Sequence, residues 1–340
     1  MEYLNRLAPD SGSHRPDRMV PAGRDDRRDD DTVSDRVLVP WQESRELAGD
    51  VTGAGLRIEV FSGDEPGPDD LKDVVFFTVP YDRPHNTEPL GRMPNLRVVQ
   101  ALTAGYEHLV DRLPPGTTLA NARGLHDSST AELALALLLA AERELPRWVR
   151  DQDEHRWEHE HTRSLAGSRV LIVGYGSIGA ALDRRLRACE AEVVRVARTA
   201  RPAEAVHGLA DLDGLLPAAD AVVLVTPLTE QTRGLLGTRR LALLPDGALV
   251  VNVGRGPVLD TAALLAETSS GRLRAALDVT DPEPLPPGHP LWDSPGVLIT
   301  PHVAGGAAAF YPAAARFVAE QVRRFAAGQP LQNVVVPGDR

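Results

Sequence analysis

The sequence contains a single cysteine, few aromatic residues and no long apolar run. Cys189 alone cannot form an intramolecular disulfide or a cysteine-based zinc cluster, and we expect it to be a small buried side chain on a helix. The longest run without a polar residue, 133–141, is well short of the roughly 20 residues that span a membrane. A basic-then-apolar leader is also missing. These absences predict a protein without a membrane segment, in a reducing compartment and by default in the cytoplasm.

The charge of the chain excludes a second group of functions. The formal net charge is −11, aromatic residues make up 4% of the chain, and basic residues form no stripe interleaved with aromatics. We therefore expect no general affinity for nucleic acid or for an anionic membrane. With 340 residues, 42% hydrophobic and 25% charged, the chain has the composition of a soluble globular protein and enough length for two domains.

The pattern of apolar residues divides the chain into a tail and two α/β series. Residues 1–35 combine mixed charge, proline and glycine with little to bury, and we expect a disordered tail. From Arg36 onward, short apolar runs alternate with helical stretches. Strands are predicted at 37–39, 57–61, 74–79, 97–102 and 117–121, and in a second series at 169–173, 192–197, 221–226, 248–253, 274–279 and 297–300.

Two long helices are predicted beside these strands. The first covers about 129–149, with its N-cap at Ser128, Ser129 or Thr130, and the last covers about 306–327. The strands show little alternation, which is typical of parallel sheets buried on both faces. We therefore predict two doubly wound α/β domains. The first covers 36–128 and is completed by 306–340, where "NVVVPG" returns to it, and the second covers 129–305.

A glycine loop in "RVLIVGYGSIGAALDRRL" predicts a dinucleotide site. Gly174, Gly176 and Gly179 follow an apolar strand and lead into a helix. In this setting the first glycine allows a tight turn, the second lets the backbone approach a pyrophosphate, and the third lets helix and strand pack closely. The pyrophosphate would lie at the helix N-terminus, where free N–H groups favour an anion.

The next strand indicates which dinucleotide is bound. Many such sites end this strand with an acid that binds the ribose 2′-OH, but "VVRVARTAR" has arginines instead. Arg198, followed by Thr199, is placed to attract a 2′-phosphate, so NADP(H) is the preferred interpretation and NAD(H) remains open. Arg201 and Arg195 could add charge, although strand alternation suggests that Arg195 points elsewhere. A solvated surface arginine is the alternative for Arg198.

Three later segments place reactive side chains at strand ends. Arg255 lies in the glycine-flanked turn of "VVNVGRG", acids follow the strand in "ALDVTDPEPLP", and His302 follows the last strand in "LITPHVAGG". Hydride transfer to a 2-oxo acid requires a cation for the carboxylate, a proton donor for the carbonyl oxygen, and a carboxylate that orients the donor. Arginine, histidine and an acid meet these needs, and strand carboxyl ends gather at one edge of a sheet.

Together these segments resemble the D-isomer-specific 2-hydroxyacid dehydrogenase family from about Arg36 to Gly338. The resemblance includes "TAGYEH", "NARGLHDSSTAELALALLL", "VGYGSIG", "VTPLTEQTRGLLG", "VNVGRGPVLD", "ALDVTDPEPLPPGHPLW" and "TPHVAGG". It implies a Rossmann nucleotide-binding domain inserted in a split, flavodoxin-like substrate domain. It also implies a homodimer formed largely through the nucleotide domains, and a small-molecule 2-oxo or 2-hydroxy acid as substrate.

The resemblance assigns roles to individual residues. The family's catalytic arginine, acid and histidine fall on Arg255, Glu283 and His302, because the "PEP" context selects Glu283 over Asp281. The loop that binds the substrate carboxylate falls on Thr103, Ala104 and Gly105, and Tyr81 is expected in the pocket. Besides the three glycines, Arg198 and Thr199, the cofactor matches are Tyr175, Ser177, Ile178, Thr226, Pro227, Thr232, Val253 and Asp278, the last expected to hold the nicotinamide amide.

Within the family, two departures bear on activity. Arg198 replaces the aspartate of NAD-using members, which resembles the NADPH-using glyoxylate and hydroxypyruvate reductases. Glu283 stands where formate dehydrogenases have glutamine, which disfavours formate oxidation. Two other readings stay open: an NAD(P)-sensing protein like the corepressors built on this scaffold, and a phosphoglycerate dehydrogenase, for which Arg83 and Arg92 could supply extra cations.

One short motif suggests a metal site that we do not predict. "HRWEH", residues 155–159, matches an inverted zinc-protease pattern, with His155 and His159 one helical turn apart and His161 nearby. The segment is charged throughout and directly precedes the first strand of the second series. A solvated linker without a metal is the expected structure.

Overall fold

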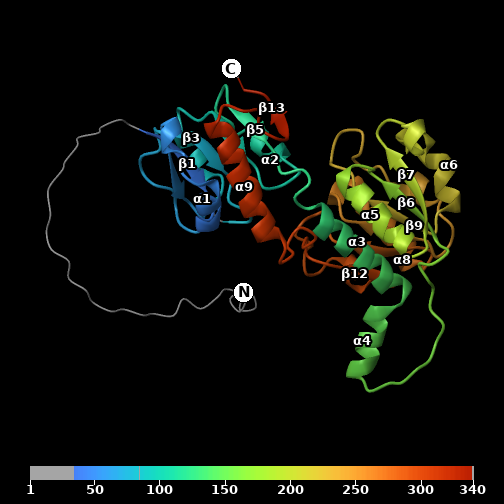
Figure 1. Cartoon of the computed structure of the whole chain (residues 1–340). Coiled ribbons are helices and arrows are strands. Elements are labelled where there is room, and N and C mark those ends of the chain that lie inside the picture. Colours follow the sequence, from blue (N-terminus) through green and yellow to red (C-terminus); the bar gives the residue numbers. More distant parts are fainter. Residues whose placement is uncertain (1–33, 84, 339–340) are drawn as a thin grey trace, which may run out of the picture. The chain divides into compact units, whose positions relative to one another are not determined.

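The protein is described by a computed structural model that covers residues 34–83 and 85–338. Residues 1–33 of the predicted disordered tail lie outside the described residues. The predicted fold class, two doubly wound sheets of largely parallel strands, is confirmed (Figure 1).

The first sheet has, among the described residues, six strands in the order β13-β5-β4-β3-β1-β2. Without β13 this is the 2-1-3-4-5 order of flavodoxin-like sheets, with all neighbours parallel. The strands are β1 (Asp35–Val39), β2 (Leu56–Val60), β3 (Val74–Thr78), β4 (Val98–Gln100), β5 (Thr118–Ala120) and β13 (Val334–Val336). The last strand pairs antiparallel with β5, so the C-terminal segment returns to the first sheet.

The second sheet has, within the same described residues, seven parallel strands in the order β12-β11-β10-β9-β6-β7-β8. The order reverses direction between β6 and β9, which is the switch point where open α/β sheets bind ligands. The strands are β6 (Arg169–Val173), β7 (Glu192–Ala197), β8 (Val206–Gly208), β9 (Ala221–Leu224), β10 (Leu249–Asn252), β11 (Arg274–Leu277) and β12 (Val297–Ile299).

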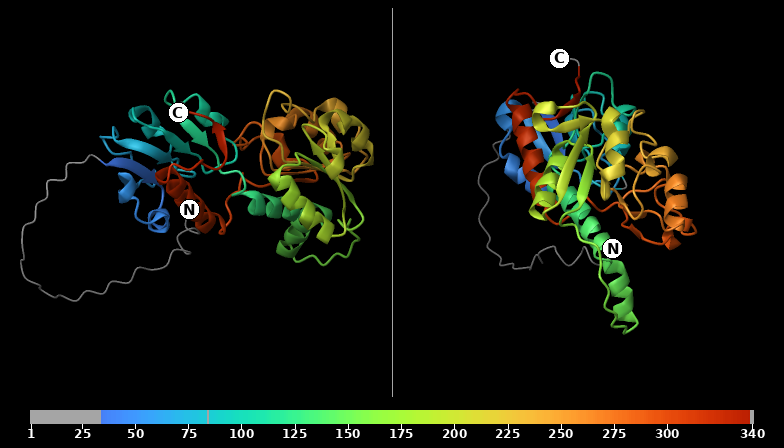
Figure 2. Two further views of the ribbon diagram at one scale, coloured as in Figure 1. Left: turned by 45° about the horizontal axis from the view of Figure 1, so that its top comes forward. Right: turned by 90° about the vertical axis from the view of Figure 1, so that its right-hand side faces the viewer.

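Helices cover both faces of each sheet. In the second sheet, the apolar side chains of α3 and α5 form the core on one face, and those of α6, α7 and α8 form the core on the other. In the first sheet, α1 and α9 lie side by side on one face, as Figures 1 and 2 both show, and α2 lies on the other. The helices are α1 (Gln42–Ala48), α2 (Glu107–Val110), α3 (Asp127–Glu142), α4 (Leu145–Asp153), α5 (Ser177–Ala188), α6 (Leu212–Leu215), α7 (Thr238–Leu241), α8 (Thr261–Ser269) and α9 (Phe310–Ala326).

The predicted helix over 129–149 is wrong in two respects. It begins earlier, at Asp127, with His126 at the N-cap position and no side-chain cap, so none of the three predicted cap residues serves. It is also two helices, because Glu144 adopts a left-handed conformation (φ 52°) between α3 and α4. Pro146 explains the break, since proline lacks the N–H that a continuous helix would use and its ring crowds the preceding turn.

Two other features differ from the sequence prediction. Strand β8 was not predicted, and it is a short strand of the sequence "VHG" at the edge of the second sheet. The last helix begins at Phe310, a turn later than predicted. In the part of the chain that the structure describes, no helix is both long and apolar enough to cross a membrane.

Candidate active site

The glycine loop joins β6 to α5 at the switch point of the second sheet. Gly174 has φ 115°, and a Cβ there would lie 2.6 Å from the carbonyl oxygen of Val225, so only glycine fits. A Cβ at Gly179 would lie 2.6 Å from the Gly174 carbonyl oxygen, which shows how closely helix and loop pack. A Cβ at Gly176 would meet no atom of the described chain within 4 Å. The space beside Gly176, at the N-terminus of α5, therefore fits a pyrophosphate.

Thr226 adds a second sign that a polar ligand belongs beside this loop. Its side chain is buried at the end of β9, and its Oγ1 has no hydrogen-bond partner among the described residues. Buried hydroxyls are normally hydrogen-bonded, so the Thr226 hydroxyl is a group that a polar ligand at the switch point could bind. Thr232, in contrast, is used within the chain, because its Oγ1 donates to the Pro227 carbonyl at 2.7 Å and accepts from the Thr229 N–H at 2.8 Å.

The three arginines after the glycine loop have different surroundings. Arg198 is exposed and makes no hydrogen bond or ion pair with any described residue, and Thr199 beside it is also exposed. Arg195 points away, as strand alternation suggested, and its Nη2 lies 2.7 Å from Oδ2 of the buried Asp183. Arg201 is held by the loop, since its Nη2 donates to the Tyr175 carbonyl oxygen at 3.0 Å. Arg198 is thus the cation left available for a 2′-phosphate.

The turn that holds Arg255 is fixed from both sides by the buried Asn252. Nδ2 of Asn252 donates to the Arg255 carbonyl oxygen at 3.0 Å, and Oδ1 of Asn252 accepts from the Gly254 N–H at 3.1 Å. The flanking glycines are required, because a Cβ at Gly254 would lie 2.8 Å from the Thr226 carbonyl oxygen and one at Gly256 would overlap the Thr280 carbonyl oxygen. Sequence reasoning did not single out Asn252, although it lies inside the quoted "VNVGRG" motif.

His302 and Glu283 form the pair that the sequence predicted. Nδ1 of His302 contacts Oε1 of Glu283, and no such contact is made by Asp281. Because Nδ1 is engaged, Nε2 is the ring nitrogen left to face a substrate. Asp278, which is 1% exposed, holds the segment around His302, since its carboxylate accepts hydrogen bonds from the Thr300 hydroxyl (2.6 Å) and the Val303 (2.9 Å) and Ala304 (3.0 Å) N–H groups.

Asp278 is therefore bonded to its own chain at both oxygens. The predicted contact between this carboxylate and a nicotinamide amide remains a prediction, as do the cofactor roles of Ile178, Pro227 and Val253. Ser177 donates its hydroxyl proton to Oδ1 of Asp127 at 2.9 Å, which joins the starts of α3 and α5.

The loop 103–105 presents its N–H groups and keeps its carbonyl groups occupied. Thr103 O accepts from the Ala122 N–H at 2.9 Å, Ala104 O accepts from Nδ2 of Asn121 at 2.7 Å, and Gly105 O accepts from Oγ1 of Thr103 at 2.5 Å. None of the three backbone N–H groups has an acceptor among the described residues. Unpaired N–H groups of successive residues form a site for an anion such as a carboxylate.

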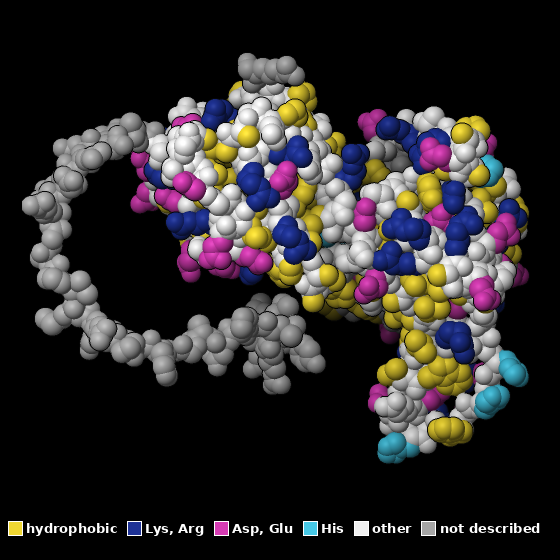
Figure 3. All heavy atoms as spheres, in the orientation of Figure 1, with side chains coloured by type: hydrophobic (Ala, Val, Ile, Leu, Met, Phe, Trp, Pro, Cys, Tyr) yellow, Lys and Arg dark blue, Asp and Glu magenta, His cyan; other side chains and the backbone are white. Residues whose placement is uncertain are grey.

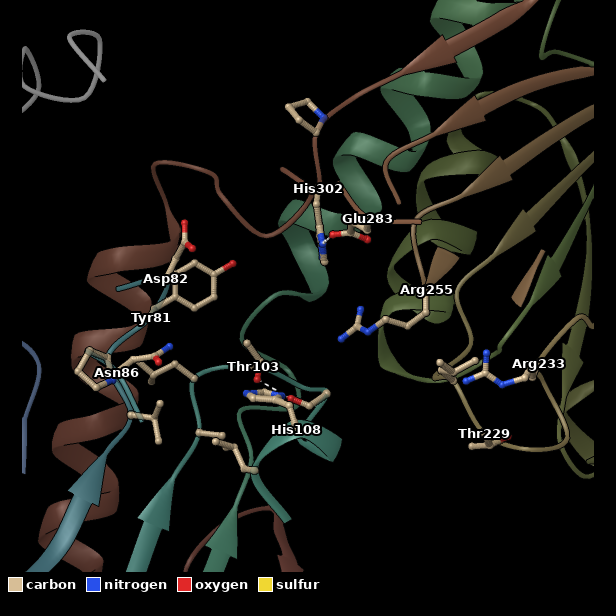
Figure 4. Close-up of a pocket in the computed structure, with 18 of the residues that line it drawn as sticks. Tyr81, Asp82, Asn86, Thr103, His108, Thr229, Arg233, Arg255, Glu283 and His302 are labelled. Atoms are coloured by element: carbon tan, nitrogen blue, oxygen red, sulfur yellow. Dashed lines mark hydrogen bonds and ion pairs between the residues drawn. The ribbon is translucent and has the colours of Figure 1, made fainter. Parts of the chain in front are cut away.

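The catalytic candidates and this loop line one pocket of about 880 Å³. Figure 4 shows Arg255 pointing into the pocket, with the Glu283–His302 pair above it and Thr103 and Tyr81 on the far side. Tyr81, predicted in the pocket, is one of its lining residues, and burial raises the pKa of its hydroxyl. Sequence reasoning missed other polar lining residues, namely Asp82, Asn86, His108, Thr229, Glu230 and Arg233. Asp82 and Asn86 lie in the loop after β3 and His108 lies on α2, and no local pattern marks any of the three as a pocket residue.

The "HRWEH" segment does not form the helix that a zinc site would need. Residues 155–159 lie beyond the end of α4, with His155 in a left-handed conformation (φ 54°). Nη2 of Arg147 lies 3.3 Å from Oε2 of Glu158, so this acid takes part in a surface ion pair. Within the described residues, no group of three or more His, Cys, Asp or Glu side chains is arranged to hold a metal ion.

Comparison with known proteins identifies the family. Residues 135–304 match the model of the D-isomer specific 2-hydroxyacid dehydrogenase NAD binding domain. The chain belongs to the D-isomer specific 2-hydroxyacid dehydrogenase family. Members of this family are NAD(P)-dependent oxidoreductases that act on small molecules, and the predicted resemblance is confirmed.

Two solved structures of this 2-hydroxyacid dehydrogenase family are similar over nearly their whole length. A family member from Xanthobacter autotrophicus Py2, in complex with NADPH and MES, is 36% identical with a TM-score of 0.73, covering 89% of this chain and 98% of that one. The NADPH-dependent glyoxylate/hydroxypyruvate reductase of Sinorhizobium meliloti, in complex with NADP and sulfate, is 29% identical with a TM-score of 0.73, covering 88% and 96%.

The chain is also similar to a longer enzyme. The D-3-phosphoglycerate dehydrogenase of Archaeoglobus fulgidus is 30% identical over 311 residues, which is 88% of this chain. The chain spans 59% of the length of that enzyme.

Proposed function

We propose that the protein reduces a small 2-oxo acid to its D-2-hydroxy acid, with NADPH as cofactor and glyoxylate or hydroxypyruvate as first candidates. The observation that supports this most is the convergence, in one pocket, of unpaired N–H groups at 103–105, the Arg255 guanidinium and the His302–Glu283 pair. These are the anion site, the cation and the oriented proton donor that the reaction requires.

In the reaction, the substrate carboxylate binds to the N–H groups of Ala104 and Gly105 and to the Arg255 guanidinium. When bound, the reduced nicotinamide supplies a hydride, which adds to the carbonyl carbon. Nε2 of His302 donates a proton to the carbonyl oxygen, so that the C=O group becomes a CH–OH group. Glu283, on Nδ1, orients the ring and stabilises the imidazolium before the proton is given up. The predicted cofactor residues position the reduced ring against this centre.

The cofactor preference is proposed from the environment of Arg198. This arginine is unpaired, whereas an acid at the same strand end would repel a 2′-phosphate, and both solved relatives described above are complexes with NADPH or NADP. NADH remains the competing cofactor. Arg198→Asp should lower kcat/KM for NADPH by about a hundredfold, since it replaces attraction of the phosphate with repulsion. The matched control is Arg316→Asp on α9, another exposed arginine.

The test of the proposed function is a set of initial rates with glyoxylate and hydroxypyruvate, each with NADPH and NADH. We expect saturable turnover with at least one 2-oxo acid and a preference for NADPH that Arg198→Asp reverses. Equal use of the two cofactors by the unaltered protein would make Arg198 a surface residue. No turnover with either acid would overturn the reductase proposal in favour of an NAD(P)-sensing protein.

Phosphoglycerate oxidation is a second candidate because of the Archaeoglobus relative. The two cations considered for its phosphate are bound elsewhere, since Nη1 of Arg83 lies 3.1 Å from Oδ1 of Asp64 and Nη2 of Arg92 lies 3.1 Å from Oε1 of Glu88. Neither arginine lines the pocket. We therefore place this activity second, and 3-phosphoglycerate with NAD or NADP belongs in the same assay.

We also propose that the protein forms a homodimer through the second sheet. Strand β12 is an edge strand of that sheet, and three large apolar side chains near α4 are exposed: Leu145 (49%), Val149 (60%) and Trp157 (98%). Figure 3 shows hydrophobic surface along α4. Burial of such side chains against a second copy would remove apolar surface from water. Sedimentation of the unaltered chain and of Val149→Asp should give a dimer and a monomer, and a monomeric unaltered chain would refute the proposal.

A further inference from the structure

His126 is a buried histidine that the proposed reaction does not use. It precedes α3, its side chain does not line the pocket, and its exposed fraction is 8%. Its ring stacks on Phe310 at the start of α9, with 4.8 Å between centroids and 12° between planes. Burial of an incompletely hydrogen-bonded polar ring costs free energy, so the position of His126 indicates a structural role.

One ring nitrogen of His126 holds the loop expected to bind the substrate carboxylate. Nε2 lies 2.8 Å from the carbonyl oxygen of Leu102, the residue directly before Thr103. Because a carbonyl oxygen can only accept, the proton of this bond is on Nε2, and the neutral ring leaves Nδ1 unprotonated. The same sequence motif, "NARGLH", also supplies Asn121, whose Nδ2 donates to the Ala104 carbonyl oxygen. Two side chains of one motif thus fix the carbonyl groups on both sides of Thr103.

The other ring nitrogen of His126 faces the segment that follows His302. Nδ1 makes no hydrogen bond of normal geometry with the described residues, although the Gly305 backbone lies close enough to favour the charged ring and so to raise its pKa. A Cβ placed on Gly305 would lie 2.9 Å from Nδ1 of His126 and 2.9 Å from the hydroxyl oxygen of Tyr81. The backbone three residues after His302 therefore passes in close contact with both side chains, and any larger residue at 305 would have to displace them.

We propose that His126 is a positioning residue that sets the substrate-carboxylate loop against the His302 segment. It binds the loop through Leu102 and packs on the segment through Gly305. One rigid ring, stacked on Phe310, thus fixes the position of the anion site relative to the proton donor. The inference rests on the proposed function for its effect on catalysis. His126 has no contact with the substrate in this proposal. Its effect is on the geometry of the loop that binds the substrate carboxylate.

The first test compares two substitutions of His126. In His126→Gln, the amide nitrogen can still donate to Leu102, because it reaches about as far as Nε2, whereas His126→Leu keeps the volume and loses the donor. We expect His126→Leu to raise KM for the 2-oxo acid about tenfold and to leave NADPH binding unchanged, and His126→Gln to stay within about threefold of the unaltered protein. The control is His207→Leu, because His207 is exposed on β8.

A second pair of variants approaches the same contact from the other side. Gly305→Ala places a methyl group against His126 and Tyr81, whereas Gly306→Ala meets its first neighbour only at 3.4 Å. Gly305→Ala should reproduce the rise in KM, and Gly306→Ala should not. This pair matters if His126→Leu fails to fold, since a glycine substitution leaves the buried ring in the chain.

Amide hydrogen exchange at Ala122, whose N–H donates to the Thr103 carbonyl oxygen at 2.9 Å, separates failure of this inference from failure of the proposed function. We expect His126→Leu to speed exchange there about tenfold, and His126→Gln and His207→Leu to leave it unchanged. If the unaltered protein reduces no 2-oxo acid but exchange responds in this way, the function fails and the positioning role stands. If the unaltered protein is active and neither KM nor exchange changes in His126→Leu, the positioning role is refuted.

Discussion

Arg195 and Asp183 form an ion pair beneath the glycine loop, with 2.7 Å between Nη2 and Oδ2. Oδ2 of Asp183 also accepts the hydroxyl proton of Tyr175 at 2.8 Å, and the Arg195 guanidinium lies 5.0 Å from the centre of the Tyr175 ring. Asp183 is almost completely buried, so its charge is balanced inside the protein. Of the three arginines in "VVRVARTAR", Arg195 is thus neutralised within the fold and Arg201 pairs with Glu204, which leaves Arg198 for the cofactor.

The His302–Glu283 pair should control turnover and leave cofactor binding intact. His302→Ala should lower kcat by about two to four orders of magnitude, because it removes the proton donor. Glu283→Gln should lower kcat less, since the ring keeps a hydrogen-bond partner but loses the neighbouring charge. Asp281→Asn is the control and should leave kcat unchanged. Steady-state rates with NADPH titrations check this, and a His302→Ala variant with full activity would refute the assigned role.

Thr226 should matter for the cofactor and not for the fold. Its Oγ1 is buried without a partner, so Thr226→Val should leave the free energy of unfolding unchanged or slightly higher, within about 1 kcal/mol. The same change should weaken NADPH binding about tenfold if the hydroxyl contacts the cofactor. Thr78→Val on β3 is a matched control, because Thr78 also has a buried, unpartnered Oγ1 but lies in the first sheet. Equal NADPH affinity in both variants would remove Thr226 from the cofactor site.

Gly256→Ala should disturb the turn that presents Arg255. The added methyl group would overlap the Thr280 carbonyl oxygen, so the turn must move, at a cost of about 1–3 kcal/mol in the free energy of unfolding. KM for the 2-oxo acid should rise as well, because Arg255 would be displaced. Gly288→Ala, where a Cβ meets no described atom within 4 Å, should have neither effect. Urea unfolding and substrate titration of both variants give the comparison, and a Gly256→Ala protein as stable as the control would contradict it.

The stability of the protein should depend on the protonation of His126. Burial lowers the pKa of His126 below the ordinary 6.5 and outweighs the opposing effects of the Leu102 and Gly305 backbone and of Asp127. Between the lowered pKa of the folded state and about 6.5, His126 is protonated more in the unfolded chain than in the folded one. The stability that the neutral His126 ring contributes is therefore complete above about pH 6.5 and is lost as the pH falls through the pKa of the folded state. Arg255 acts in the same direction as burial.

His126→Gln removes this titration, because an amide does not ionise in the range. Urea unfolding at about pH 7.5 and pH 5 should show a smaller loss of stability on acidification in the variant than in the unaltered protein. Other histidines are common to both proteins and cancel in the difference. If both proteins lose the same free energy, His126 is not the group responsible.

Local patterns in the sequence predicted most of the architecture and the groups at strand ends. The glycine loop, the turn at Arg255 and the strands of buried valine and leucine are each determined by neighbours in the chain, so sequence alone could indicate them. The break between α3 and α4 had a local signal in Pro146, which the uniform apolar pattern of α3 obscured. Strand β8 had none, because "VHG" acquires its pairing only from β7.

The parts of the candidate site that the sequence did not reveal depend on contacts between distant segments. Asn121 and His126 act on carbonyl groups that lie 17 and 24 residues away. The hydrogen bonds of Asp278 reach the segment after β12, a relation that a strand-end aspartate does not disclose by itself. Side chains such as Asn86 and Arg233 line one pocket, from opposite sides, only because both sheets are folded (Figure 4).

The antiparallel pairing of β13 with β5 has a consequence for biosynthesis. The strands of the second sheet are contiguous in the chain, from β6 to β12, whereas β13 follows all of them. A ribosome therefore releases the whole second sheet before the last strand of the first, and β5 waits with an open edge until residues 334–336 emerge. The first sheet, which carries the Thr103 side of the pocket, is therefore the last to be completed. We expect nascent chains that end before β13 to fold the second sheet but not yet to bind a substrate.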